Sequence, residues 1–138
     1  MNLLNFNNDD IMYEVNTKRK TVTAYIGDVW CDFDAVLDTP LGIALNVVMM
    51  SGIKIPELPA KFAATARCKP GEEFDVEKGK RVARLKLLRK VTQAESVHTR
   101  FIQKKFEEVT AVVADSLTKR NDNYAKRLNN IVGYLEKE

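Results

Sequence analysis

The last third of the chain carries an apolar stripe at helical spacing, and a domain of this size is too small to cover it. The stripe comprises Val113, Leu117, Tyr124, Leu128, Ile131 and Leu135. If a helix runs unbroken over 93–137, it is about 65 Å long at about 1.5 Å per residue, and the whole stripe lies on one side. We therefore predict that residues 93–138 form a helical oligomerisation region, most simply a coiled coil between copies of the chain.

A polar interruption of the stripe leaves a second interpretation open. Residues 118–123 contain no large apolar side chain, although apolar segments lie on both sides of them. A turn at this point would fold the region back on itself as an αα-hairpin. One long helix and a hairpin are therefore both consistent with the pattern.

The first half of the chain predicts a small antiparallel sheet. Residues 11–15 and 21–26 are rich in β-branched and aromatic side chains and flank a basic loop, which is typical of a β-hairpin. Apolar residues alternate with more polar ones over 29–34 and again over 61–68. This alternation predicts two further strands, each with one apolar face.

Between the third and fourth predicted strands the sequence predicts a helix. Asp38-Thr39-Pro40 combines a capping side chain with a proline near the first turn, which favours a helix start. Residues 41–50 are apolar nearly all round, so we expect this helix to be buried. Ser51-Gly52 should end it.

A second helix is predicted after the turn Lys69-Pro70-Gly71, with Asp75 as its cap, and it extends to about Val91. Gly79 inside this helix costs about 1 kcal/mol relative to alanine. We expect a close helix–strand approach, against Ala64 and Ala66, to compensate for that cost.

These elements predict an α+β fold. A small antiparallel sheet of about four strands would be packed by two helices and followed by a long C-terminal helix or αα-hairpin. The expected division is an α+β core domain over 1–92 and the helical oligomerisation region over 93–138.

Charge is distributed unevenly along the chain. Residues 1–60 have a net charge of −4, residues 61–100 of +6 and residues 101–138 of +1. The predicted ligand- or partner-binding residues are the cations of the middle region: Arg67, Lys69, Lys78, Lys80, Arg81, Arg84, Lys86 and Arg89. A solvated face with snorkelling stems is the simpler interpretation, and the helical cations divide between two sides, which weakens the prediction of nucleic-acid binding.

No combination of residues indicates catalysis, a metal site or a cofactor. His98 is the only histidine, and it lies on the apolar side of its helix near Ala94 and Ile102, where a core or interface histidine is expected. The aspartates over 28–38 more simply keep a strand face hydrated than hold a divalent ion. We therefore expect a protein that is not an enzyme.

The sequence also indicates the cellular compartment. The N-terminus lacks a basic segment and a long apolar segment, so no signal peptide is expected. No run of about 18 apolar residues could span a membrane. Cys31 and Cys68 are too few for a disulfide framework. We predict a reducing, cytoplasmic environment and no membrane partner.

Residues 66–83 resemble a motif of small tailed-bacteriophage and prophage proteins, Cys-x-Pro-x-acidic-x-Phe-Asp followed by Gly-x-x-aliphatic-Ala. The matching positions are Cys68, Pro70, Glu72, Phe74, Asp75, Gly79, Val82 and Ala83. The resemblance covers about 18 of 138 residues. It implies a phage accessory protein in the bacterial host cytoplasm, and it assigns no catalytic residue and no ligand to this chain. The motif also has a structural explanation as a turn, a helix cap and a close helix contact.

These expectations combine into one functional prediction. The chain would be a homo-oligomeric, non-enzymatic phage accessory protein that binds and blocks or sequesters a host or anti-phage-defence component. That component would be a protein or a small anionic ligand such as a nucleotide. The alternatives are a nucleic-acid-binding accessory protein and a virion or scaffold component.

Overall fold

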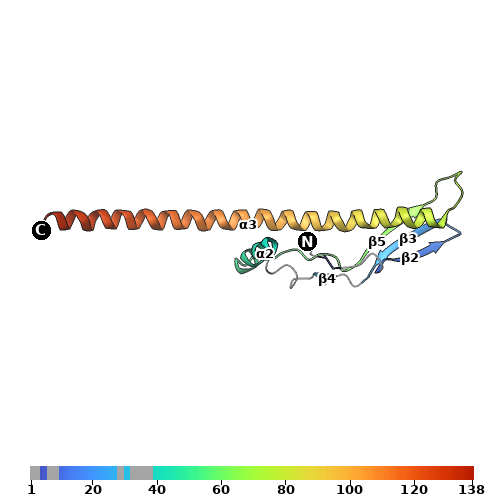
Figure 1. Cartoon of the computed structure of the whole chain (residues 1–138), viewed down its shortest axis with the longest axis horizontal. Helices are drawn as coiled ribbons and strands as arrows, with labels where there is room; N and C mark the ends of the chain where they lie inside the picture. Colours follow the sequence, from blue (N-terminus) through green and yellow to red (C-terminus); the bar gives the residue numbers. More distant parts are fainter. Residues whose placement is uncertain (1–3, 6–9, 28–29, 32–38) are drawn as a thin grey trace.

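A computed structural model describes residues 4–5, 10–27, 30–31 and 39–138 of the chain. One long helix, α3 (Val76–Glu136), determines the shape of the molecule. Figure 1 shows a small β-sheet beside the N-terminal end of α3 and the short helix α2 (Pro40–Met50) farther along it, while the C-terminal half of α3 extends alone. The α+β class and the long C-terminal helix are thus as predicted.

The main sheet is antiparallel and has the order β2-β3-β5. Its strands are β2 (Met12–Asn16), β3 (Thr21–Ile26) and β5 (Phe62–Arg67). The predicted hairpin is confirmed, since Asn16 pairs with Thr21 across a loop of residues 17–20. β5 pairs with the other side of β3, with Ala64 opposite Ala24.

The predicted number of about four strands in this sheet is wrong among the described residues. Of the predicted third strand, Trp30–Cys31 forms β4. It pairs with β1 (Leu4–Asn5) in a separate two-stranded sheet, not with the hairpin. Residues 28–29 and 32–38, which include Asp38 of the predicted helix start, lie outside the described residues.

The core lies between the sheet and the first part of α3. One face of β3 contributes Val22, Ala24 and Ile26, and β5 contributes Ala64 and Ala66, all buried. The helix supplies Ala83, Leu87 and Val91 at intervals of four residues. Small residues on the strand side let the helix lie close to the sheet.

Gly79 is where α3 comes nearest to the sheet. A Cβ atom at this position would lie 2.6 Å from Cγ2 of Val22. The predicted close approach is confirmed, but the neighbour is Val22 on the central strand and not Ala64 or Ala66. A glycine is needed here because the valine is fully buried and its branched side chain has little rotamer freedom.

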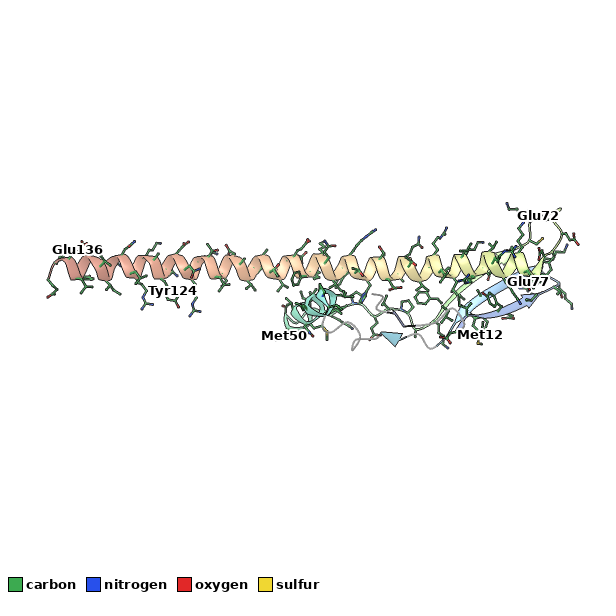
Figure 2. The ribbon with its side chains drawn as sticks, viewed as in Figure 1. Met12, Met50, Glu72, Glu77, Tyr124 and Glu136 are labelled. Atoms are coloured by element: carbon green, nitrogen blue, oxygen red, sulfur yellow. The ribbon has the colours of Figure 1, made fainter. Side chains whose placement is uncertain are left out.

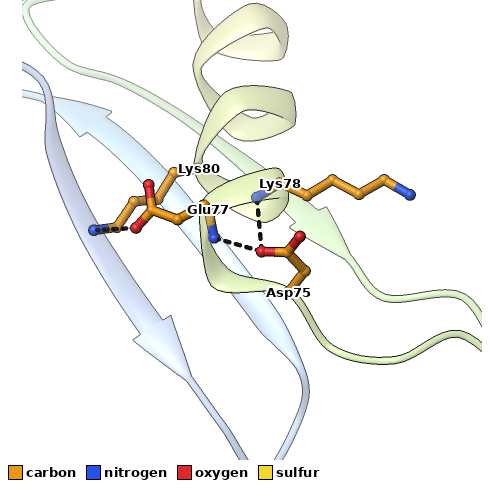
Figure 3. Close-up of polar contacts among 4 residues, drawn as sticks. All are labelled: Asp75, Glu77, Lys78 and Lys80. Carbon is orange, nitrogen blue, oxygen red and sulfur yellow. Dashed lines mark hydrogen bonds and ion pairs between the residues drawn. The ribbon is translucent and has the colours of Figure 1, made fainter.

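The start of α3 is capped as predicted. Oδ1 of Asp75 accepts hydrogen bonds from the backbone N–H of Glu77 at 3.0 Å and of Lys78 at 3.2 Å (Figure 3). Gly71 precedes the cap with a φ of +84°, a left-handed conformation that glycine adopts without steric cost. Glu77 adds negative charge to the first turn, where it is favoured by the helix dipole.

The expected end of this helix near Val91 is wrong, because residues 76–136 form one unbroken helix. Of the two alternatives for the C-terminal region, the long helix is confirmed and the αα-hairpin with a turn over 118–123 is excluded. At about 1.5 Å per residue, the 61 residues of α3 span about 90 Å.

α2 packs along α3 and does not form a second layer on the sheet. Leu45 of α2 and Ile102 of α3 are buried against each other. The hydroxyl of Thr39 accepts a hydrogen bond from the N–H of Gly42, confirming the predicted start of α2. The expected burial all round is wrong, because Ile43 is 57% exposed and Met50 is 88% exposed.

Candidate functional site

The apolar stripe on the C-terminal half of α3 is the largest feature that the fold does not use. Every stripe residue is exposed, from 42% for Tyr124 to 66% for Leu135. In Figure 2 Tyr124 projects from α3 on the side where α2 and the sheet lie, beyond the end of α2. The stripe, Val113, Leu117, Tyr124, Leu128, Ile131 and Leu135, is called the seam below.

Tyr124, at the centre of the seam, is held in position by two arginines of the same helix. Nε of Arg120 donates a hydrogen bond of 2.9 Å to the hydroxyl of Tyr124, and its guanidinium lies 5.6 Å from the ring centroid. The guanidinium of Arg127 lies 6.0 Å from the same centroid. Two cations on one exposed ring restrict its rotamers, so less entropy is lost when a partner covers it.

Local contacts explain why the polar stretch over 118–123 remains helical. Lys119 pairs with Asp115 at 3.1 Å, one turn earlier, and Arg120 bonds to Tyr124, one turn later. The hydroxyl of Thr118 donates to the carbonyl of Ala114. None of these residues is proline or glycine, so the backbone has no reason to break.

The predicted basic residues fall into separate groups around the start of α3. Lys80 points toward β2, where its ammonium lies 5.7 Å from the ring centroid of Tyr13 and 3.8 Å from Glu77. Lys86 reaches the opposite side, to β5. The structure therefore does not gather the predicted cations on one face, in agreement with the split seen in the sequence.

Lys86 and Lys90 cover the edge of β5 that faces away from β3, a role that the sequence analysis missed. The ammonium of Lys86 donates to the carbonyl of Thr65 at 3.3 Å, and that of Lys90 to the carbonyl of Ala63 at 2.6 Å. Cys68 bonds through its N–H to Lys20 on the β3 side, so alternation places the carbonyls of residues 63 and 65 on the outer edge. The i, i+4 spacing of two lysines matches the two-residue repeat of the strand edge. Charged side chains over an edge oppose pairing with another strand.

The other predicted cations remain at the surface. Arg67 lies at the end of β5, in a polar hollow on the outer sheet face that also includes Thr23 and Thr65, whose hydroxyls are 2.8 Å apart. Of the predicted binding residues, Lys80 alone forms an ion pair within the described part of the chain. The exposed cations are Arg67, Lys69, Lys78, Arg81 and Arg89, and Arg84 is half-buried.

His98 is buried where α3 meets the segment after α2. Burial lowers the pKa of His98 below its usual value of 6.5, and a hydrogen bond with the backbone of Pro56 partly opposes that shift. A hollow of about 640 Å³ adjoins the imidazole, lined mainly by apolar residues of α2 and the following segment such as Leu45, Ile55 and Leu58. The histidine lies in the core, as expected from its apolar neighbours.

The described residues contain no group of three or more His, Cys, Asp or Glu side chains that could hold a metal ion. The aspartates at 28, 32, 34 and 38 lie outside these residues. Cys68 is half-buried and its thiol donates to the carbonyl of Glu72 at 3.3 Å, which closes the turn before α3. No helix in the described ranges has the length and apolarity needed to cross a membrane.

Comparisons of the chain with protein-family models, with curated proteins and with solved structures found no match. The proposed function therefore depends on the geometry of the molecule and on the sequence resemblance of residues 66–83.

Proposed function

We propose that this chain is a non-enzymatic binding protein that assembles with a second copy through the seam. The single observation that carries the proposal is the exposure of the seam on a helix that is otherwise well formed. Complete burial of an exposed aliphatic side chain contributes about 1.5–3 kcal/mol, and covering the part of each seam side chain that is still exposed contributes a fraction of that amount. Single exposed apolar residues are common, but a contiguous line of them marks an interaction surface.

A seam covered by a second copy of the chain is more favourable than a seam that stays exposed to water. Most helical stability in proteins comes from packing of an apolar face and not from the propensity of the residues. The far half of α3 has no packing partner within the described chain. Association would supply it.

The assembled protein would present the sheet and the surrounding cations to its target. The resemblance of residues 66–83 to phage and prophage proteins supports a host or anti-phage-defence component, protein or anionic nucleotide, as that target. The bacterial host cytoplasm is the corresponding proposed location. Blocking or sequestration is the mode of action that needs no catalytic group.

Light scattering on the full-length chain tests assembly. We expect a dimer or larger species at micromolar concentration. Leu128→Glu combined with Ile131→Glu should return the monomer mass, because four buried apolar side chains per dimer become charged. The matched control is Thr118→Glu with Asn129→Glu, which adds the same charge on the far side of α3 and should leave the mass unchanged. A full-length chain that stays monomeric at several hundred micromolar contradicts the proposal.

Nucleic-acid binding is the alternative that the exposed cations favour. An electrophoretic shift assay at 20 mM and 200 mM salt separates it from protein binding, because phosphate contacts release counterions and lose affinity steeply with salt. Arg81→Glu with Arg84→Glu should then abolish the shift. No shift at the lower salt would remove this alternative. Detection in purified particles would instead support a virion or scaffold component.

A further inference from the structure

The seam continues a repeat whose first part is already buried. Val91, Ile102, Val113, Tyr124 and Leu135 follow one another at intervals of eleven residues. Eleven residues are about three helical turns plus 20°, so these side chains stay on nearly one side of a straight helix. Val91 packs on the sheet and Ile102 on α2, whereas Val113 is 51% exposed.

We propose that two copies pair antiparallel along the seam, with Tyr124 of each copy at the two-fold axis. This inference rests on the proposed assembly. Val113 then lies level with Leu135 of the second copy, and Leu117 level with Ile131. The occupant of the seam is thus the same helix segment running in the opposite direction. A two-fold contact of this kind closes on itself and gives a dimer.

The positions of α2 and the sheet oppose a parallel pair. Both elements lie on the side of α3 from which Tyr124 projects (Figure 2), and α2 packs on Ile102. A parallel pair with α3 helices about 10 Å apart would bring the sheets and α2 helices of both copies together on that side. In the antiparallel pair the second copy covers the free segment. Its Leu135 lies level with Val113, about 16 Å along α3 from Ile102.

In the antiparallel pair, the seam residues that lie level with one another also have compatible side chains. The central layer holds two tyrosines, each already held by Arg120 and Arg127 of its own chain. The outer layers combine a smaller with a larger aliphatic side chain, Val113 with Leu135. A pairing shifted by one turn would break this match and move the tyrosines off the axis.

Disulfide trapping between full-length chains tests direction and register. Val113→Cys and Leu135→Cys are made as two separate proteins, each with Cys31→Ser and Cys68→Ser, and oxidised with copper phenanthroline alone and as a 1:1 mixture. Serine keeps a donor for the carbonyl of Glu72. We expect at least a fivefold excess of the mixed disulfide dimer over either self-disulfide. The control pair, Lys119→Cys with Asn129→Cys, is level in the same register but faces away from the seam, and should not cross-link.

Light scattering on the same proteins distinguishes the two proposals. A dimer in which Val113→Cys alone self-links, with no gain on mixing, overturns the antiparallel arrangement and leaves assembly through the seam intact. A dimer that forms neither disulfide overturns the register. A monomer overturns the proposed assembly and this inference with it.

Discussion

The two halves of α3 have similar apolar periodicity, but the apolar stripe is buried in the first half and exposed in the second. Over 76–102 the apolar side chains lie against the sheet and α2, and Ala83 and Leu87 have no exposed surface. Over 103–136 the continuing stripe has more than two fifths of each large side chain in solvent. The same helical pattern can therefore build a core or a contact surface, and the difference depends on what the rest of the chain places beside it.

Matched leucine substitutions should show the largest difference between the halves. Leu87→Ala removes a fully buried side chain and should lower the free energy of unfolding by about 2–5 kcal/mol. Leu117→Ala should change it by less than about 0.5 kcal/mol in the monomer and should instead weaken association. Guanidinium denaturation at two protein concentrations separates the two effects. Equal losses at low concentration would mean that the far half is packed within one chain.

Alanine at the two glycines of α3 should act in opposite directions. At Gly79 the added methyl group meets Val22, and the overpacking cost of about 1–3 kcal/mol exceeds the helix-propensity gain of about 1 kcal/mol. At Gly133 nothing lies within 4 Å of the new carbon, so only the gain of up to about 1 kcal/mol remains. Thermal denaturation followed by circular dichroism measures both. A stabilising Gly79→Ala would show that α3 can move away from β3.

Lysine substitutions should give a smaller contrast. Lys90→Met removes the hydrogen bond to the carbonyl of Ala63 and should cost up to about 1 kcal/mol. It should also increase aggregation, because the β5 edge loses a covering charge. Lys126→Met, in the far half of α3, should be neutral on both counts. Turbidity and chemical denaturation of the two variants provide the test, and identical behaviour would contradict the edge role.

The last contrast concerns pH. Burial lowers the pKa of His98 in the folded chain, so the unfolded chain takes up its proton first as the pH falls. Stability from this residue is complete above about pH 6.5 and is lost as the pH falls through that value toward the lower folded pKa. Denaturation between pH 7.5 and 5.5 should show this loss, and His98→Gln should reduce the slope. An unchanged slope would assign the pH dependence to other groups.

The local signals of the sequence were sufficient for much of this fold. The hairpin, the starts of both helices, the cap at Asp75 and the close approach at Gly79 depend on residue types within a few positions of each other. The seam was also visible, because its period is a property of one helix. The break expected near residue 92 is absent, and of the two alternatives for the C-terminal region the long helix is correct, because a polar run such as 118–123 does not end a helix when side-chain pairs one turn apart support it.

The sequence by itself determined which side chains form an apolar line and that a helix begins at the Asp75 cap. Only the tertiary structure decided that α2 lies on α3 and covers Ile102, and that Lys86 and Lys90 cover the edge of β5. Those outcomes depend on contacts between residues far apart in the chain, such as Leu45 with Ile102. No local pattern contains them, since the same periodic stripe is compatible with burial by the chain itself or by another molecule.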